Sequence, residues 1–323
     1  MRWLRGLLLI SLALTVGCGS EASEWAAATQ IGAFTGRVVA LDTRDGAVFA
    51  VVVDATAGRA SLVQVADPPV ELDSATLQPP TGTAVDGPGL LAAGTEAIIW
   101  ASLGSGPRWV SRSAGPKDEA VALDGIYEGI TQIDAGPTEF VWTRHGKGEA
   151  WAVADAPSPT QARLLATLEF PSGIAGTSHG AYVVDRLAAS LWRFTDAGSG
   201  LVASWLGDNT MALAHDEQTL VFRNHAQGRI VRMPLPTGDL VELPQTNVES
   251  WGPIAPGPGV VYSAPFAEDA RRAVLAWSHS GGDAESVGPV GTGCTPALGI
   301  DAGAVLFSDC AGGVWRRAHR GSD

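Results

Sequence analysis

The pentapeptide Gly176-Thr177-Ser178-His179-Gly180 matches the G-x-S-x-G pattern that exposes a nucleophilic serine in hydrolases. That chemistry needs the serine on a strained turn between a strand and a helix, beside an oxyanion hole. Here both flanking segments have the apolar pattern of strands, and the chain has Asp134-Ala135-Gly136 and Asp301-Ala302-Gly303 at equivalent places. We therefore interpret the pentapeptide as a turn between strands and expect no catalytic residue.

The six histidines could bind a metal only if the fold brings them together. His179 and His215 are expected in equivalent turns of adjacent sequence repeats, where two imidazoles could share a Zn²⁺, but a zinc site needs further protein ligands. The sequence identifies none, and it contains no Cys-x-x-Cys, P-loop or EF-hand pattern. We expect no metal and no other cofactor.

Basic residues recur where the second strand of a repeat ends. Arg144 and Arg186 occupy equivalent positions, and Arg223 lies one place earlier. A cationic cluster of this kind could hold a carboxylate or an anionic sugar. The possible ligand face comprises Arg144, His145, Arg186, Arg223 and His225. The alternative is that carboxylates such as Asp185 neutralise these charges.

The composition restricts the class of protein. The 323 residues are 46% hydrophobic, as in folded globular domains. There are 34 acidic residues against 21 Lys and Arg, which gives a net charge of −13. Because nucleic-acid binding relies on clustered basic residues, we expect no nucleic-acid partner.

The N-terminus carries an export signal. Arg2 and Arg5 precede an apolar stretch at residues 7–14, which is too short to span a membrane as a helix. The following Thr15-Val16-Gly17-Cys18 resembles a bacterial lipoprotein signal, which implies removal of residues 1–17, a lipidated Cys18 and a tether at residues 18–24. Gly19 in place of Asp implies the outer membrane where the source has one. The alternative is an ordinary signal peptide that is cut at a nearby small residue.

The two readings of the N-terminus differ in a measurable way. In a bacterial host fed labelled palmitate, the wild-type chain should incorporate the label and the Cys18→Ser variant should not. Gel fluorography of the purified chains measures this. An unlabelled wild-type chain would leave the ordinary signal peptide as the explanation.

Export also bears on the other two cysteines. With Cys18 lipidated, Cys294 and Cys310 remain as an even pair in an oxidising compartment. If 297–301 and 304–308 form a hairpin, residues near 294 and 310 lie opposite each other, at a Cα separation that a disulfide can bridge. We predict a Cys294–Cys310 disulfide.

Four short apolar runs separated by turn residues fill the stretch from Met211 to Asn247, and no window of the chain has a convincing helical period. Seven copies of this pattern begin near residues 36, 90, 130, 173, 211, 252 and 296. Their spacing of roughly 40 residues is typical of four-stranded propeller blades. A large apolar residue recurs in the third strand of five copies, as packing between blades requires: Trp109, Trp151, Trp192, Val231 and Trp315.

The segments VVDRLAASLWRFTDAG and VFRNHAQGRIVRMPLPTG resemble the repeats of NHL-type and YWTD-type β-propellers. The resemblance implies an all-β fold with a single propeller at residues 25–323. We expect seven four-stranded blades. The alternative is six blades, which those families commonly have.

The seventh copy contains only three strands, and a closed propeller leaves no unpaired strand edge at the junction of its two ends. The segment Trp25–Thr35 is the only unassigned stretch long enough to supply the fourth strand. We therefore expect it to form the outer strand of the last blade. The rival is an open six-bladed ring with an N-terminal extension.

These features favour a non-catalytic lipoprotein of the cell envelope, a monomer that binds or scaffolds a protein or glycan and contacts the membrane through its lipid. A fold does not imply a function. The alternative is a propeller hydrolase or lyase with a metal at the central channel, for which Asn209 and Asn247 are the only suggestive pair. The segment Ala40-Leu41-Asp42 with Gly46 also resembles the propeller lipoprotein of the outer-membrane barrel-assembly machinery.

Overall fold

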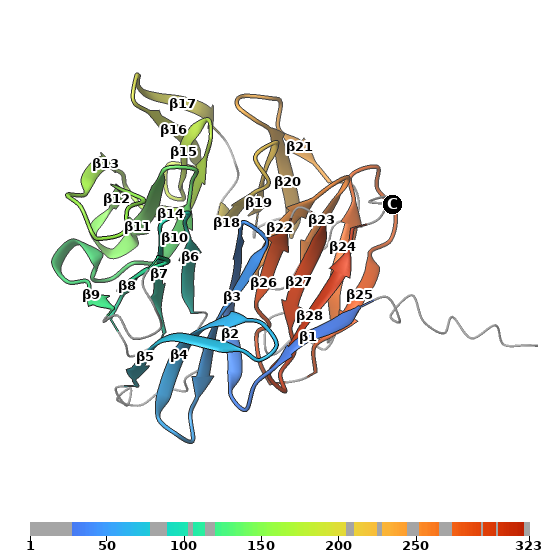
Figure 1. The fold of residues 1–323 in the computed structure, drawn as a ribbon. Helices are drawn as coiled ribbons and strands as arrows, with labels where there is room; N and C mark the ends of the chain where they lie inside the picture. The colour runs from blue at the N-terminus through green and yellow to red at the C-terminus, as the bar shows by residue number, and fades with distance from the viewer. Residues whose placement is uncertain are drawn as a thin grey trace, which may run out of the picture.

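The computed structural model describes residues 28–77, 89–102, 106–113, 120–204, 210–224, 228–243, 252–264, 273–291, 293–301 and 303–319. Across these residues the chain forms seven four-stranded antiparallel sheets, arranged as the blades of one propeller (Figure 1). The helical elements described are two 3-10 turns, η2 (Gly125–Tyr127) and η3 (His145–Lys147). The predicted all-β, seven-bladed fold is confirmed, while the signal peptide, Cys18 and the tether lie outside the described residues.

Each blade is an antiparallel meander whose first strand lies innermost. Blades 1 to 4 contain β2 Arg37–Arg44, β3 Ala47–Asp54, β4 Arg59–Val65 and β5 Val70–Thr76; β6 Leu90–Ala93, β7 Ala97–Ala101, β8 Arg108–Ser111 and β9 Val121–Ala122; β10 Gln132–Ala135, β11 Glu139–Arg144, β12 Glu149–Ala154 and β13 Arg163–Thr167; and β14 Pro171–Thr177, β15 Gly180–Asp185, β16 Ser190–Thr195 and β17 Gly198–Ser204. Blades 5 to 7 contain β18 Thr210–His215, β19 Thr219–Asn224, β20 Arg229–Pro234 and β21 Val241–Glu242; β22 Ile254–Gly257, β23 Val260–Ser263, β24 Ala273–Ser278 and β25 Glu285–Pro289; and β26 Leu298–Asp301, β27 Ala304–Ser308, β28 Gly313–Ala318 and β1 Thr29–Ala33.

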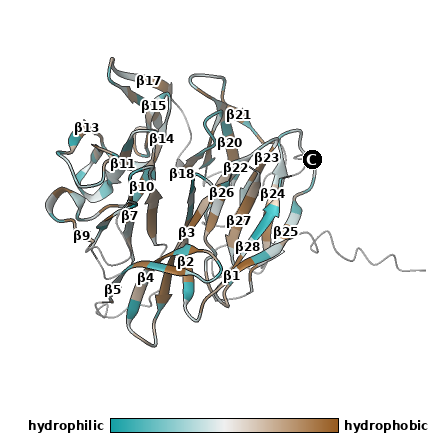
Figure 2. Cartoon of the chain, viewed as in Figure 1, coloured by the Kyte–Doolittle hydropathy of each residue, from teal (hydrophilic) through white to brown (hydrophobic). Residues whose placement is uncertain are grey.

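Burial decreases from the second strand of a blade to the fourth. All five residues of β7 are buried, whereas the first four residues of the outer strand β17 are exposed. A blade packs its two faces against its two neighbours, so its second strand must be apolar on both sides. Figure 2 shows the result, with brown concentrated on the strands and hydrophilic colour mostly on the loops and outer edges.

Aromatic side chains fill the spaces between blades. The Trp109 ring of blade 2 meets Phe140 of blade 3 edge-on, with ring centroids 5.2 Å apart. Trp142 stacks on Trp151 at 6.4 Å, and both rings belong to the cluster between these two blades. The large residues predicted at one register position, including Trp192, all lie on third strands. Four of them pack in clusters shared with the preceding blade, which confirms the predicted position: Trp151, Trp192, Val231 and Trp315. Trp109 instead packs against the following blade, and its neighbour Val110 faces the preceding one, so the placement of Trp109 in the same position is wrong.

The two ends of the chain together build blade 7. β1 pairs antiparallel with β28, with Gln30 opposite Trp315 and Ala33 opposite Gly313, so the blue and red strands lie side by side in Figure 1. The Phe34 N–H extends the pairing by donating to the Gly312 carbonyl at 3.0 Å. The predicted closing strand is confirmed, with Thr29–Ala33 as its extent, and the open six-bladed alternative is wrong.

A disulfide joins Cys294 to Cys310, whose Cα atoms are 5.6 Å apart. The predicted hairpin is present as β26 and β27, which lie between the two cysteines in the sequence. The Cys310 N–H also donates to the Val290 carbonyl at 2.8 Å. The disulfide therefore joins the segment before β26, which contains Cys294, to the turn after β27, which contains Cys310.

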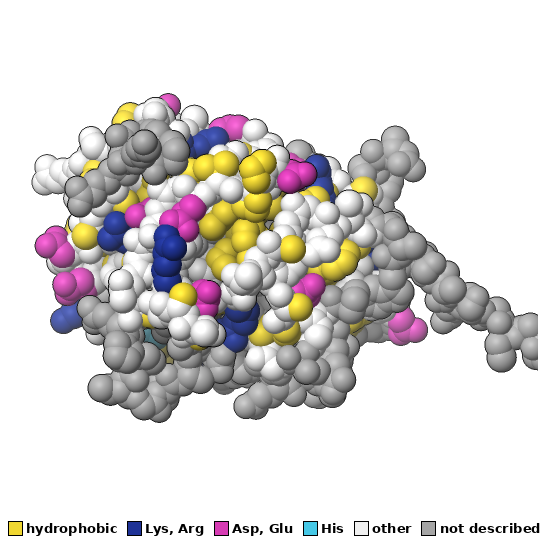
Figure 3. All heavy atoms as spheres, turned by 60° about the horizontal axis from the view of Figure 1, so that its bottom comes forward, with side chains coloured by type: hydrophobic (Ala, Val, Ile, Leu, Met, Phe, Trp, Pro, Cys, Tyr) yellow, Lys and Arg dark blue, Asp and Glu magenta, His cyan; other side chains and the backbone are white. Residues whose placement is uncertain are grey.

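Charges of opposite sign lie close together on the outer surface. Cross-strand ion pairs join third and fourth strands, as in Arg59–Glu71 of blade 1 and Arg229–Glu242 of blade 5. Figure 3 shows basic and acidic groups interspersed with hydrophobic atoms on one face. Pairs of this kind are exposed and contribute little to stability. Among the described residues, no helix is long and apolar enough to cross a membrane.

Deletion of residues 25–35 should destabilise the whole ring. The deletion removes the partner of β28 and exposes its edge, together with the apolar contacts that Ile31 and Phe34 make with blade 1. We expect the melting temperature to fall by about 10 °C or more, which corresponds to a loss of several kcal/mol in a domain of this size. Differential scanning calorimetry measures it, and an unchanged transition would show that closure does not stabilise the fold.

Candidate functional site

A cavity of about 630 Å³ opens at the axis of the ring, on the face that carries the turns between first and second strands. Its walls come from six inner strands, namely β2, β6, β10, β18, β22 and β26, and the adjoining turns. We call this cavity the axial mouth. Its charged and amide side chains are Asp42, Arg44, Asp45, Gln132, Asp134, His215, Asp216, Glu217 and Asp301. Residues from widely separated parts of the chain thus converge at one opening.

His215 and Asp134 form the best-defined polar contact in the axial mouth. The imidazole Nε2 lies 3.0 Å from the Asp134 carboxylate, and Nδ1 accepts the Glu217 N–H at 3.3 Å. This arrangement places the ring proton on Nε2, facing Asp134. Burial disfavours the charged imidazole, but the Asp134, Glu217 and Asp216 carboxylates together outweigh it and raise the pKa of His215 above its ordinary value.

The same side chains tie three blades together at the axis. The Asp134 carboxylate of blade 3 accepts the Gly176 N–H of blade 4 at 2.8 Å and meets His215 of blade 5. The Gln132 amide donates to the Ile174 carbonyl at 3.2 Å and to the Leu213 carbonyl at 3.0 Å. These bonds satisfy inner-strand carbonyls that have no further strand on the axial side.

Asp42 performs a similar role between blades 1 and 2. Its carboxylate accepts the N–H groups of Thr43 and Ala93, each at 2.7 Å. Burial raises the pKa of Asp42 to about 7, with a further contribution from the negative charge of Asp134, although the two N–H donors oppose the rise. A carboxyl group that exchanges its proton near neutral pH therefore lies within the axial mouth.

The basic face predicted from the sequence lies at turns between second and third strands, and its members have different surroundings. Arg144 donates to the Glu128 carbonyl at 2.9 Å and pairs with Glu149 at 3.1 Å. The alternative stated from the sequence was that carboxylates neutralise these arginines. For Arg144 such a carboxylate is present, and it is Glu149.

His145 and Arg186 come together around one aromatic ring. The His145 and Phe170 rings lie 4.2 Å apart, and the Arg186 guanidinium lies 5.5 Å from the centre of the same ring. Burial and the Arg186 charge lower the pKa of His145. Arg223, in contrast, is fully buried in β19, and burial lowers its pKa to about 10. His225 lies outside the described residues.

The G-x-S-x-G pentapeptide is a tight turn between β14 and β15, as interpreted from the sequence. The Thr177 hydroxyl donates to the Gly180 carbonyl at 2.9 Å and closes the turn. The Ser178 N–H donates to the Glu217 carboxylate of the next blade at 2.8 Å. Because the serine precedes a strand and not a helix, it lacks the environment of a nucleophile elbow.

The sequence interpretation missed Asp42, Asp134 and Gln132 as residues of a common site. A signal was present, since the Asp-Ala-Gly at 134–136 repeats at 301–303, and the two aspartates are the second-last residue of β10 and the last residue of β26. Asn209 and Asn247 lie outside the described residues. Within the described ranges, no group of three or more His, Cys, Asp or Glu side chains is arranged to hold a metal.

Comparison with known proteins identifies the fold. No protein-family model and no curated protein matches the chain. Virginiamycin B lyase from Staphylococcus aureus is 12% identical with a TM-score of 0.60, over 90% of this chain and 98% of the lyase. BamB from Moraxella catarrhalis is 12% identical with a TM-score of 0.52, over 88% and 84% of the two chains.

A WD40 propeller domain, that of Doa1, is 14% identical with a TM-score of 0.61, over 91% of this chain and 96% of the domain. Identities this low establish similarity of fold alone. The chain is therefore a β-propeller whose function must be argued from its own residues.

The axial mouth should make stability depend on pH. Because the folded state raises the pKa of Asp42 from 3.8 to about 7, ionisation of this group lowers the unfolding free energy. The loss is absent below pH 3.8, grows as the pH rises and is complete above about pH 7. The pKa of His215 is higher in the folded chain than in the unfolded chain, so protonation of His215 stabilises the folded state. This stabilisation is fully present below the unfolded-state pKa and is lost as the pH rises through the folded-state pKa. Both groups therefore favour the folded state at acidic pH.

We expect Asp42→Asn to reduce the loss of unfolding free energy between pH 5 and pH 8 by about 1–3 kcal/mol relative to wild type. Urea titrations at each pH measure this difference. Asp239→Asn, at an exposed position, is the matched control and should retain the wild-type dependence. Equal slopes for Asp42→Asn and wild type would contradict the assigned pKa.

Proposed function

We propose that the protein is a non-catalytic binding or scaffolding module of the cell envelope, attached to the membrane through a lipid on Cys18. The observation that carries the proposal is the axial mouth, where polar side chains from many blades line one cavity. Such a cavity, with polar groups at fixed positions, is the usual location of a binding site. The partner is a protein or a glycan.

The chemistry of His215 favours binding over catalysis. A general base needs a nitrogen lone pair within reach of a substrate proton. In the axial mouth Nε2 faces Asp134 and Nδ1 accepts the Glu217 N–H, so both nitrogens are engaged. The His215–Asp134 pair is the one feature that favours the second candidate, a propeller hydrolase or lyase, but it serves as a tie between blades 3 and 5.

The charge of the axial mouth favours a protein partner with basic side chains. Six acidic side chains line it, from Asp42, Asp45, Asp134, Asp216, Glu217 and Asp301, against Arg44 and His215. Arg112 pairs with Asp45 and Arg316 with Asp301, and the raised pKa of Asp42 reduces its charge, yet acidic groups still outnumber basic ones. The Arg44 guanidinium is already engaged, because it donates to the Thr95 hydroxyl at 2.9 Å. The Asp45 and Glu217 side chains are 58% and 44% exposed, so a partner can reach them. Complementary charge accelerates association and selects partners.

A double variant, Asp45→Asn with Glu217→Gln, tests this proposal. Both substitutions keep the side-chain shape at the rim and leave Asp42 and Asp134 in place. Envelope partners cross-linked to the full-length lipoprotein in cells should be recovered about tenfold less with the variant. Their recovery with wild type should also fall as salt increases, because exposed charges are screened.

The matched control removes two carboxylates elsewhere, with Glu71→Gln and Glu242→Gln on the outer strands β5 and β21. Their exposure is similar, at 44% and 47%. Quantitative mass spectrometry of the cross-linked material measures all three chains. The proposal fails if partners are captured equally by both double variants, or if capture is independent of salt.

A further inference from the structure

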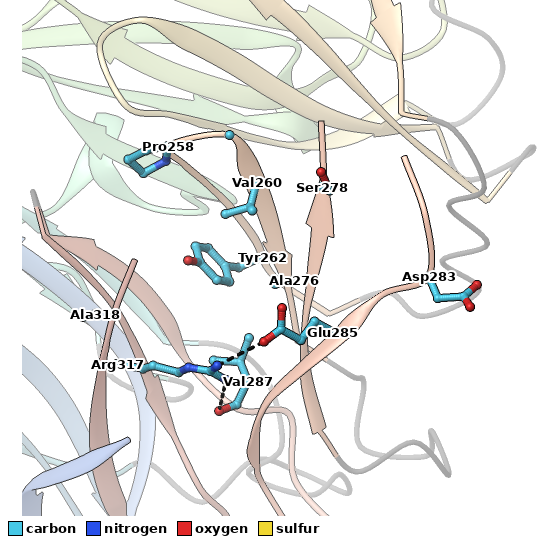
Figure 4. Close-up of a pocket in the computed structure, with 11 residues that line it drawn as sticks. Pro258, Val260, Tyr262, Ala276, Ser278, Asp283, Glu285, Val287, Arg317 and Ala318 are labelled. Carbon is cyan, nitrogen blue, oxygen red and sulfur yellow. Dashed lines mark hydrogen bonds and ion pairs between the residues drawn. The ribbon is translucent and has the colours of Figure 1, made fainter. Parts of the chain in front are cut away.

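A second cavity, of about 260 Å³, lies between blades 6 and 7, away from the axial mouth. Figure 4 shows that its residues come from three strands of blade 6 on one side and from the end of β28 on the other. Alternate residues of the blade 6 sheet face it: Val260 and Tyr262, Ala276 and Ser278, Glu285 and Val287. The opposite wall is formed by Arg317 and Ala318.

The cavity has a structural origin in the closure of the ring. The pairing of β1 with β28 begins at Thr29 opposite Arg316, one residue before the cavity wall. Along the rest of the boundary, cluster residues such as Val287 and Phe307 pack the two blades together. The opening thus lies at the end of β28, where the described residues of blade 7 leave the sheet of blade 6 uncovered.

An ion pair lies at the base of this pocket. The Arg317 Nη2 is 3.2 Å from the Glu285 carboxylate, and Nη1 donates to the Ser286 and Val287 carbonyls at 3.0 and 3.1 Å. Three contacts therefore fix the plane of the guanidinium. The side chains of Arg317 and Glu285 are 14% and 23% exposed, and both line the cavity. Dashed lines in Figure 4 mark the contact between them.

Tyr262 adds a hydroxyl whose role as hydrogen-bond donor is set by its partner, His319. The His319 Nε2 lies 3.1 Å from the Asp301 carbonyl, which can only accept, so this nitrogen carries the proton. Burial lowers the pKa of His319, which favours the neutral ring. The His319 Nδ1 then accepts, and the Tyr262 hydroxyl donates to it at 2.9 Å. The Tyr262 oxygen consequently presents acceptor capacity within the pocket lining.

These groups together select a neutral, hydroxylated ring. A hydroxyl can donate to the Glu285 carboxylate and accept from Arg317 at once, whereas a single ion would meet a like charge in the pair. Asp283 also lines the cavity, but its carboxylate points away from this pair in Figure 4. The aliphatic walls at Val260, Ala276 and Val287 suit the C–H face of a ring. The volume lies below the roughly 300–1,000 Å³ of pockets for drug-sized ligands, so it suits one ring.

We propose that the pocket between blades 6 and 7 binds a single neutral sugar ring, with hydroxyls on the Glu285–Arg317 pair and its apolar face on Val260 and Val287. The site is separate from the axial mouth and does not depend on the function proposed for it. Either site can therefore fail its test while the other stands.

The test uses the full mature chain and a panel of methyl glycosides of neutral hexoses and N-acetylhexosamines. Saturation-transfer-difference NMR detects binding, and titration gives the dissociation constant. We expect at least one neutral glycoside to bind with a dissociation constant of about 1 mM, a weak affinity that suits one ring. Glucosamine and glucuronate, which carry opposite charges, should bind more weakly.

Two variants locate the binding. Glu285→Gln removes the charged acceptor and should weaken binding about tenfold or more. Ala276→Phe fills the pocket, leaves the ion pair intact and should abolish binding. The matched control is Glu242→Gln, on the outer strand of blade 5, which should bind as wild type. A melting temperature within a few degrees of wild type is required of each variant used.

The proposal is overturned if no neutral glycoside on the panel binds the wild-type chain, or if a charged sugar binds more tightly than its neutral counterpart. It is overturned equally if Ala276→Phe retains wild-type affinity. Binding that survives in Glu242→Gln and is lost in Ala276→Phe supports it. Because both variants leave the axial mouth unchanged, the partner capture described above remains an independent measurement.

Discussion

Pairing of β1 with β28 is the contact on which the rest of the structure depends. Seven twisted sheets bury their faces only if each has a neighbour on both sides, and the ring meets this condition only when its two ends join. Gly312 shows how close the junction is: it adopts a φ of +88°, and a Cβ there would lie 2.4 Å from the Phe34 and Gly36 carbonyl oxygens. Closure thus requires glycine at a defined point and places β1 on the outer edge of blade 7.

Closure also creates the polar centre. Inner strands have no partner strand on the axial side, so their backbone groups must find hydrogen bonds from side chains. Gln132, Asp134 and Asp42 provide them across blade boundaries. A carboxylate in this position is enclosed by other strands, which is why burial raises the pKa of Asp42 to about 7. The side chains that hold the inner strands together are therefore the ones that give the axial mouth its charge.

The two cavities differ in chemistry because they differ in position. Inner strands end at the axial mouth, so their terminal aspartates and turn residues gather there and make it acidic. The pocket between blades 6 and 7 lies against a sheet face, where alternation brings aliphatic side chains and one balanced Glu285–Arg317 pair. The first favours a charged partner on electrostatic grounds, and the second favours a neutral ring.

Periodicity and spacing in the sequence determined the architecture. Repeated apolar runs, the three-stranded last repeat and the Cys294–Cys310 pair all have local or one-dimensional signatures, and the structure contains each feature. The surroundings of individual polar residues were decided by tertiary structure. Arg144 and Arg223 occupy nearly equivalent places in their repeats, yet one pairs with Glu149 near the surface and the other is fully buried. Asp134 and His215 are 81 positions apart and meet only because the ring curves past blade 4. Contacts across blades depend on the closed ring, and a repeat read by itself cannot contain them.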